Sequence, residues 1–233
     1  MSPKGRSALL LGATGLVGRA CLDLLLARTE YSRVVVLSRR ELGIASANLD
    51  VRLVDFDRPQ GLRPVATDDV FFALGTTMAK AGSPAAFERV DYGYALLAAD
   101  LAKQGGAGRF LLVSSVGADP ESSTCYLRVK GETEAMIRAK SFRATHVFRP
   151  GLLLGDRTEL RPMEALARAT LPWLNPLLVG GLRRYRAIRA EVVARAMVAA
   201  ALSDTWGTHV HHYDEMVRLA SGDAGPAARR DTD

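Results

Sequence analysis

Short apolar runs and longer amphipathic segments alternate along the chain. The first run, Ala8 to Leu11, has the length of a buried strand, and apolar residues then recur at helical spacing from Leu16 to Arg28. Later runs rich in β-branched and aromatic residues are spaced as strands joined by helices. Further strands are expected at Arg33 to Leu37, Val51 to Val54, Val70 to Leu74, Phe110 to Ser114, Thr145 to Phe148 and Thr208 to Tyr213.

Helix signals fall between these runs. Ser83 and Pro84 are typical of an N-cap followed by a first-turn proline, and the pattern from Ala85 to Gln104 predicts one long helix. Two more helices are expected, from Ser123 or Thr124 to about Lys140 and from Glu191 to Ser203. Alternating strands and helices predict parallel βαβ units, and therefore an α/β fold with a doubly wound parallel sheet.

The length of 233 residues fits one domain of the larger α/β type. We expect residues 1–220 to form this domain, with 151–189 contributing a small C-terminal substrate lobe. The segment 221–233 is rich in Gly, Ala and charge, and we expect it to be a disordered tail. The formal net charge is +6, but the basic residues are spread along the chain, which argues against a nucleic-acid partner.

Cysteine and histidine usage gives no sign of a metal. Cys21 and Cys125 are too few for a disulfide framework or a metal site, and they suit a reducing cytosol, so we expect a cytoplasmic protein. His209 and His211 share a face of the last expected strand, next to His212. Because no Cys or carboxylate lies at ligand spacing from them, a surface or edge strand is favoured over a metal site.

Membrane insertion is not expected. The apolar run at Ala8 follows basic residues, as in a signal peptide, but Gly12 interrupts it, which favours a buried strand. The apolar segment from Leu171 to Leu182 contains Pro172 and Pro176, and a membrane-spanning helix needs roughly 20 apolar residues.

Three glycines spaced three apart follow the first strand. Gly12, Gly15 and Gly18 permit a tight turn in which the amide groups of a helix N-terminus face outward, and such a turn is a seat for a phosphate or pyrophosphate. The alternative is that these glycines serve packing alone. The residues assigned to this seat are Gly12, Ala13, Thr14, Gly15, Leu16, Val17 and Gly18.

The residues at the end of the second strand indicate which dinucleotide fits. In enzymes that use NAD, an acidic side chain at this place binds the ribose 2′-hydroxyl. Here the residues are Ser38, Arg39 and Arg40, and guanidinium groups bind a 2′-phosphate instead. We therefore expect NADP(H) in preference to NAD(H), the alternative being that both arginines simply face solvent.

Two further strand ends supply candidate cofactor contacts. Asp55 and Phe56 follow the third strand, where a carboxylate can accept from the adenine amino group and a ring can cover its face. Gly75, Thr76 and Thr77 follow the fourth strand, and ligands of open α/β sheets bind at such carboxyl ends.

Tyr126 and Lys130 lie four residues apart, so a helix presents both on one face. A phenol ordinarily titrates near pH 10, and a nearby cation favours its ionised form. Ser115, at the end of a strand, can polarise a carbonyl oxygen held beside that phenol. We therefore expect Ser115, Tyr126 and Lys130 to be catalytic, although an isolated Tyr–Lys pair is also compatible with a solvated helix face.

These motifs, GATGLVG, Ser114–Ser115 and the Tyr126 to Lys130 pair, resemble the short-chain dehydrogenases/reductases over nearly the whole chain. More closely, the chain resembles the atypical branch that contains the Tat-interacting-protein-like oxidoreductases. The segments that carry this likeness are Leu74 to Thr77, Val90–Asp91, Leu112 to Ala118, Tyr126 to Glu132, Phe148 to Leu154 and Asp156–Arg157.

The resemblance implies a Rossmann domain that binds NADP(H), with Tyr126 as proton donor, Lys130 on the nicotinamide ribose and Ser115 orienting the carbonyl. It also implies cofactor contacts from the segments after the fourth, fifth and sixth strands. These are Leu74, Ser114, Arg149, Pro150, Gly151 and Leu152, with the proline and glycine along the nicotinamide. The asparagine that completes the proton relay in other members has no clear counterpart, although Asp91 occupies roughly that stretch.

The sequence thus predicts an oxidoreductase that transfers a hydride between NADP(H) and a small carbonyl or alcohol substrate. Two alternatives remain open. One is a non-enzymatic NADP(H)-binding regulatory or scaffold protein, and the other is a sugar-nucleotide epimerase, which uses the same Ser, Tyr and Lys but needs a larger C-terminal lobe. The expected partner is a small-molecule substrate, and a homodimer is compatible with the sequence.

Overall fold

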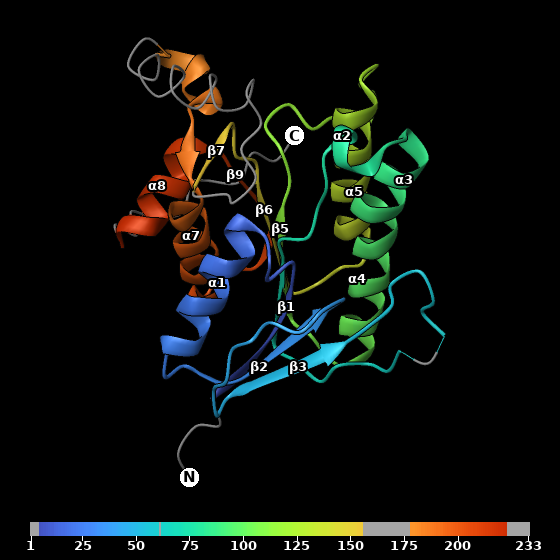
Figure 1. Cartoon of the computed structure of the whole chain (residues 1–233). Helices are drawn as coiled ribbons and strands as arrows, with labels where there is room; N and C mark the ends of the chain where they lie inside the picture. Colours follow the sequence, from blue (N-terminus) through green and yellow to red (C-terminus); the bar gives the residue numbers. More distant parts are fainter. Residues whose placement is uncertain (1–4, 61, 156–177, 223–233) are drawn as a thin grey trace.

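The computed structural model describes residues 5–60, 62–155 and 178–222. Seven strands form a sheet in the order β3-β2-β1-β4-β5-β6-β9, and all adjacent pairs are parallel (Figure 1). The strands are β1 (Arg6–Leu11), β2 (Tyr31–Ser38), β3 (Leu49–Leu53), β4 (Asp69–Phe72), β5 (Arg109–Val113), β6 (Ala144–Phe148) and β9 (Gly207–His211). This is the expected doubly wound α/β fold.

Helices cover both faces of the sheet. One layer contains α1 (Leu16–Ala27), α7 (Ala190–Leu202) and α8 (Tyr213–Ser221). The other contains α3 (Pro84–Glu88), α4 (Tyr94–Gln104) and α5 (Cys125–Ala139), while the four-residue α2 (Met78–Ala81) follows β4 (Figure 1).

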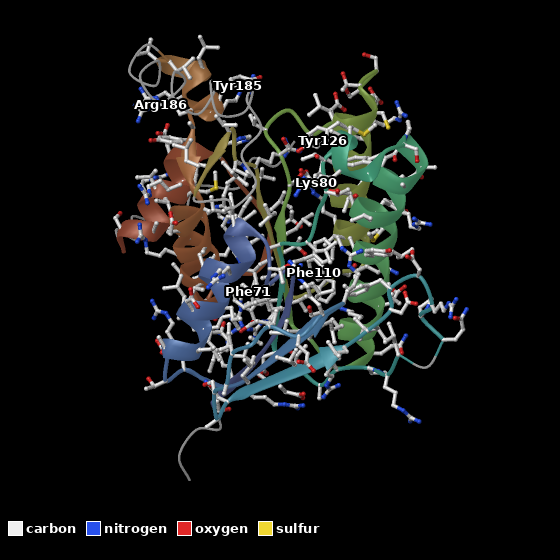
Figure 2. All side chains as sticks on the ribbon, in the orientation of Figure 1. Phe71, Lys80, Phe110, Tyr126, Tyr185 and Arg186 are labelled. Carbon is white, nitrogen blue, oxygen red and sulfur yellow. The ribbon has the colours of Figure 1, made fainter. Side chains whose placement is uncertain are left out.

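Each face of the sheet has its own apolar core, because successive side chains of a strand point to opposite faces. Phe71 packs into the core under α1 and α7, whereas Phe110 packs into the core under α4 (Figure 2). The inner strands are buried on both faces, as Leu9 and Leu10 of β1 illustrate with 0% exposure each. Such strands read as unbroken apolar runs, which is why the sequence predicts them well.

The expected helix from Ala85 to Gln104 is real but not uniform. Between α3 and α4, residues Arg89–Gly93 form a π-helical turn, η1, so the helix contains a wider turn at this point. Apolar periodicity does not reveal a single wide turn, since the residues on either side of it continue at helical spacing.

The expected strand from Thr208 to Tyr213 is too long. Strand β9 ends at His211, and Tyr213 already begins α8. The backbone N–H of His212 donates to the Glu215 carboxylate at 3.1 Å, a capping interaction that stops the strand and starts the helix.

The region between residues 151 and 189 lies largely outside the described residues. Its described parts are β7 (Leu153–Leu154), which pairs in parallel with β8 (Ile188–Arg189), and the 3₁₀ turn η3 (Gly180–Tyr185). The expected substrate lobe at 151–189 remains a prediction. Of the expected tail at 221–233, Ser221 is the last residue of α8 and Gly222 is its C-cap, while residues 223–233 lie outside the described ones.

The strand order reverses at β1, which lies between β2 and β4. The loops that follow β1 and β4 therefore leave the same edge of the sheet as neighbours. A Cβ atom on Gly12 would come within 2.4 Å of the Ala73 carbonyl oxygen, so the two loops touch. Ligands of open α/β sheets bind at such a switch point.

Candidate functional site

The glycine turn after β1 leaves no room for side chains at two of its three glycines. Gly12 has a φ of +89°, which disfavours other residues, and a Cβ on Gly18 would lie 2.0 Å from the Gly12 carbonyl oxygen. Gly15 differs, since its Cβ would meet that oxygen at 3.3 Å, and its backbone N–H donates to the same oxygen at 2.9 Å. Gly12 and Gly18 thus let the first turn of α1 lie against β1.

The N-terminus of α1 has no side-chain cap. Its N-cap residue is Gly15, which makes no side-chain cap hydrogen bond to the first turn. The first amide groups of a helix have no partner within the helix and form, with the helix dipole, a site for an anion. The exposed Thr14 and Gly15 border this site. The turn therefore fits the pyrophosphate of a dinucleotide.

The end of β2 presents two cations to solvent. The Ser38 hydroxyl donates to the Arg40 carbonyl oxygen at 2.6 Å, which fixes the turn that follows the strand. Arg39 and Arg40 are exposed, and neither forms an ion pair with any residue in the described part of the chain. Their guanidinium groups are therefore available to an anionic ligand.

The loop after β3 is fastened to the helix layer. Phe56 is buried and stacks on the Tyr94 ring, with centroids 5.0 Å apart. The Tyr94 hydroxyl donates to Asp57 at 2.7 Å, and Arg89 lies 3.3 Å from the same carboxylate oxygen. Asp55 stays exposed, whereas Phe56 packs within the protein; their predicted contacts with adenine remain predictions.

Strand β4 leads into a loop that lies against a buried ion pair. The Thr76 N–H donates to one oxygen of Asp91 at 3.0 Å, and the other oxygen lies 2.6 Å from the Lys130 ammonium. A Cβ on Gly75 would be 3.2 Å from Asp91 and 3.6 Å from the Lys130 ammonium nitrogen. Thr77 caps α2 by accepting from the Lys80 N–H at 3.2 Å. The expected loop and the expected lysine are thus brought together.

Tyr126 is the second residue of α5 and lies at the carboxyl edge of the sheet (Figure 2). Its ring packs on Phe87 of α3 at 5.4 Å between centroids. Burial on its own would lower the pKa of Lys130, but the Asp91 carboxylate and the Tyr126 phenol raise it above its usual value of 10.5. These two groups therefore favour the charged form of Lys130.

Gly131 lets the loop before α5 lie against that helix. A Cβ on Gly131 would lie 2.2 Å from the Pro120 nitrogen, so only glycine fits directly after Lys130. The Asp119 N–H donates to the Leu127 carbonyl oxygen at 3.1 Å in the same contact. In the sequence Gly131 was noted only as part of the Tyr126 to Glu132 segment that carries the family resemblance, without a role of its own.

A second buried carboxylate, Glu134, was not predicted. It accepts two hydrogen bonds from Arg149, at 2.9 and 2.6 Å, and one from the Ser114 hydroxyl at 2.6 Å. The side chains of Ser114 and Arg149 are therefore engaged within the protein. Their predicted contacts with a cofactor remain predictions.

The segment after β6 is held by backbone contacts. The Val116 N–H donates to the Pro150 carbonyl oxygen at 3.0 Å, and the Ile188 N–H to that of Leu152 at 2.9 Å. A Cβ on Gly151 would lie 2.7 Å from the Arg186 carbonyl oxygen. Ser115, on the neighbouring loop, is half-buried, and its hydroxyl donates to the Val116 carbonyl oxygen at 3.3 Å.

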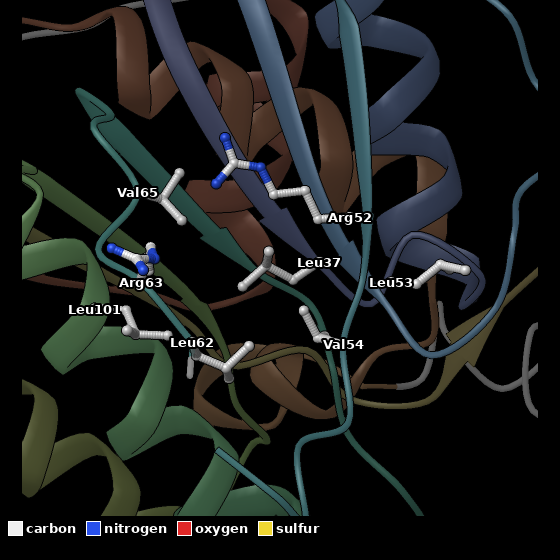
Figure 3. A pocket seen from close by; sticks show the side chains of 8 residues that line it. All are labelled: Leu37, Arg52, Leu53, Val54, Leu62, Arg63, Val65 and Leu101. Atoms are coloured by element: carbon white, nitrogen blue, oxygen red, sulfur yellow. The ribbon is translucent and has the colours of Figure 1, made fainter. Parts of the chain in front are cut away.

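A hollow of about 260 Å³ lies elsewhere, beside the edge of the sheet (Figure 3). It is bordered by the ends of β2 and β3, the loop before β4 and α4. Its lining is mainly apolar, with two arginines: Leu37, Arg52, Leu53, Val54, Leu62, Arg63, Val65 and Leu101. None of the predicted site residues lines it, so the chemistry of Tyr126 and Lys130 is not located there.

Three histidines form a stack between β6 and β9. His146 lies 5.1 Å from His209 and 5.3 Å from His211 between ring centroids, and its Nδ1 is 3.0 Å from the His211 Nε2. Burial, with the neighbouring imidazoles, lowers the pKa of His146 to about 3 and that of His211 to about 4. His209 and His211 share a face, as expected, but His146 was missed as their third member.

Two features are absent from residues 5–60, 62–155 and 178–222. No helix there is long and apolar enough to cross a membrane. No group of three or more His, Cys, Asp or Glu among these residues could hold a metal ion.

A glycine turn at the switch point of a parallel sheet, with an uncapped helix N-terminus beside it, defines an α/β protein of the Rossmann type. A family model described as NAD(P)H-binding matches residues 12–172. The chain therefore belongs to this NAD(P)H-binding family. The family model supports NAD(P)H binding without distinguishing between the two dinucleotides.

Curated relatives agree with this family. Protein HTATIP2 of Rattus norvegicus is 40% identical over 200 residues, covering 84% of this chain and 81% of the relative. Protein FMP52-1 of Scheffersomyces stipitis, named mitochondrial, is 41% identical over 197 residues, covering 82% and 87%. These relatives confirm the resemblance to the atypical short-chain dehydrogenases/reductases.

Solved structures share the fold at low identity. A UDP-N-acetylglucosamine 4-epimerase from Methanobrevibacter ruminantium gives a TM-score of 0.65 at 16% identity, covering 90% of this chain and 77% of that one. The human epimerase family protein SDR39U1, solved with NADPH, gives 0.62 at 16% identity, covering 88% and 74%. At this identity the likeness shows the fold alone.

The expectation of a cytoplasmic location is contradicted. Besides the Scheffersomyces stipitis protein, relatives from Aspergillus terreus and Aspergillus fumigatus, 36% and 37% identical, are also named mitochondrial. The expectation rested on the reduced cysteines, and reduced cysteines occur in more than one cellular compartment. The names point away from a purely cytoplasmic protein.

Proposed function

We propose that the protein is an NADP(H)-dependent oxidoreductase that transfers a hydride between the nicotinamide and a small carbonyl or alcohol substrate. The single observation that carries this proposal is the ion pair of Lys130 with Asp91, which lies directly against the loop after β4. It joins the helix that bears Tyr126 to the edge of the sheet at which the glycine turn lies.

The pyrophosphate of the cofactor would be held mainly by backbone amides, and its 2′-phosphate by arginine side chains. Gly12 and Gly18 make the turn in which the N-terminal amides of α1 receive the pyrophosphate. Arg39 and Arg40 would bind the 2′-phosphate, which only NADP(H) carries. The backbone of Gly75 and of Pro150–Gly151 would border the nicotinamide half.

The bound nicotinamide supplies or accepts the hydride. Tyr126 would give its phenolic proton to the carbonyl oxygen in reduction, or take it back in oxidation. The Lys130 charge favours the phenolate left after that transfer, and the Ser115 hydroxyl would donate to the same carbonyl oxygen and orient it. Lys130 would also hold the nicotinamide ribose.

Replacement of Tyr126 by Phe tests this function. We expect Tyr126→Phe to bind NADPH with nearly unchanged affinity, measured by fluorescence, and to lose NADPH oxidation with every carbonyl in a broad panel that the natural protein reduces. Tyr213→Phe, at the start of α8, is the matched control and should keep its activity. Full turnover by Tyr126→Phe would exclude the catalytic assignment.

A regulatory NADP(H)-binding protein is the competing function. It is favoured if the natural protein binds NADPH tightly but oxidises it with no carbonyl, while cofactor binding changes its affinity for a protein partner. The sugar-nucleotide epimerase alternative gains no weight from the solved epimerases, since they share the fold at 16% identity. Interconversion of a UDP-sugar without net NADPH consumption would support it.

A further inference from the structure

Asp91 and Lys130 form an ion pair buried where three segments meet. Their exposed fractions are 2% and 8%, and the carboxylate oxygen lies 2.6 Å from the ammonium nitrogen. Asp91 belongs to the π-helical turn, Lys130 to α5, and the Thr76 N–H that binds the other carboxylate oxygen to the loop after β4. One carboxylate therefore joins all three segments.

The π-helical turn Arg89–Gly93 is the local structure that presents Asp91. Such turns are rare, and they occur frequently at functional sites. Helix α5 also contacts the backbone of the turn, because the Thr133 hydroxyl lies 3.4 Å from the Asp91 carbonyl oxygen and 2.7 Å from that of Val129. The unusual backbone thus coincides with the residue that contacts the lysine.

A buried ammonium requires a counter-ion, because removal from water disfavours its charged form. Within the described part of the chain, the ionisable groups that face Lys130 are Asp91 from η1 and Tyr126 and Glu134 from α5. Glu134 is already engaged by Arg149 and Ser114. Tyr126 is neutral when it holds its proton. Asp91 is the remaining carboxylate, and it is in direct contact.

We propose that Asp91 is a positioning residue, the counter-ion that keeps the buried ammonium of Lys130 charged and fixed beneath Gly75 and Thr76. The charge that the phenolate of Tyr126 needs is thereby provided in a site that otherwise favours neutral lysine. The link to proton transfer rests on the proposed function. The ion pair itself is measurable without cofactor or substrate. The counter-ion role of Asp91 and the proposed oxidoreductase function can therefore be refuted separately.

The test is the titration of Lys130 in the full-length protein by NMR with ¹³Cε-labelled lysine. The chain has few lysines, namely Lys4, Lys80, Lys103, Lys130 and Lys140, and the spectrum of Lys130→Met assigns the signal. In the natural protein Lys130 should titrate above 10.5. In Asp91→Asn its pKa should fall by about two units or more, since burial then acts without a counter-ion.

Asp100→Asn is the matched control. Asp100 pairs with Lys140 at the surface, where the side chains are 42% and 29% exposed. Because solvent compensates that charge, the Lys140 signal in Asp100→Asn should titrate as in the natural protein. A Lys130 pKa that stays above 10 in Asp91→Asn would overturn the proposal.

Stability against pH gives a second readout. A buried lysine with a lowered pKa makes the folded chain bind fewer protons than the unfolded one, so the stability of Asp91→Asn should rise from neutral to alkaline pH. If Asp91→Asn does not fold, the double variant Asp91→Asn/Lys130→Met tests the counter-ion role instead, because it removes both charges of the buried pair. Recovery of folding supports the counter-ion role, and failure alongside a folded Lys130→Met overturns it.

Discussion

Arg149, just after β6, and Glu134, within α5, are joined by two parallel hydrogen bonds, from Nε to Oε1 at 2.9 Å and from Nη2 to Oε2 at 2.6 Å. Planar pairing of this kind fixes geometry as well as supplying energy. It ties the chain that leads into Pro150 and Gly151 to the helix that carries Tyr126 and Lys130. The two halves of the candidate active site are therefore held in one frame.

Glu134→Gln should destabilise the protein by about 3–5 kcal/mol, because it leaves a largely buried guanidinium without its counter-ion. Urea unfolding measures this. The control is Asp214→Asn, which breaks the pair with Arg183 whose side chains are 48% and 42% exposed. Exposed pairs contribute about 0–1 kcal/mol, so equal losses in both variants would contradict the assigned role.

Gly18→Ala should abolish NADPH binding and lower stability markedly, because its Cβ would lie 2.0 Å from the Gly12 carbonyl oxygen. Gly15→Ala places its Cβ at 3.3 Å, so the fold should survive while the side chain obstructs the pyrophosphate. Thermal unfolding and NADPH titration separate the two effects. Gly108→Ala, just before β5, is the control, since its Cβ would meet nothing closer than 3.9 Å, and it should be nearly neutral in both measurements.

Arg39→Ala should weaken NADPH binding about tenfold or more, with NADH binding nearly unchanged, because a guanidinium contact to phosphate contributes roughly 1.5–3 kcal/mol. Arg28→Ala, at the far end of α1, removes the same charge and serves as the control. Calorimetric titration with each dinucleotide decides. Equal losses for NADPH and NADH would contradict binding of the 2′-phosphate.

The histidine stack should make the fold sensitive to acid. The pKa of His146 is about 3 and that of His211 about 4 in the folded chain, against 6.5 when unfolded, so the unfolded chain binds more protons between these values. Stability should therefore fall as pH decreases from 6.5 toward 4, by about 1.4 kcal/mol at most for each unit of pKa difference. Urea unfolding over this range should show a shallower slope in His146→Gln; an unchanged slope would exclude the stack as the cause.

The features that the sequence predicts well are those formed by residues close together in the chain. The apolar runs of β1, β4 and β6 predict their strands because both faces are buried. The glycine turn and the Tyr126–Lys130 pair are likewise visible, because the residues of each motif lie within a few positions of one another. Strand β9 was predicted with the wrong end, since the interaction of His212 with Glu215 outweighs the β-propensity of Tyr213.

What the sequence did not reveal depends on contacts between distant elements. Asp91 was noted only by resemblance, and its contact with Lys130 requires α5 to pack against a turn whose π geometry leaves no periodic signal. Glu134 reads as an ordinary polar residue of an amphipathic helix. Its burial as a charged group depends on Arg149, which directly follows β6 and pairs with it. Ion pairs of this kind follow from the fold, not from spacing.

The π-helical turn Arg89–Gly93 makes this stretch intolerant of changes in chain length. Loss of one residue there would allow a regular α-helix, and because each α-helical residue turns the chain by about 100°, Asp91 would leave the lysine while the helix as a whole persisted. A one-residue gap aligned at this point would thus mark a relative that keeps the architecture but has lost its charged centre.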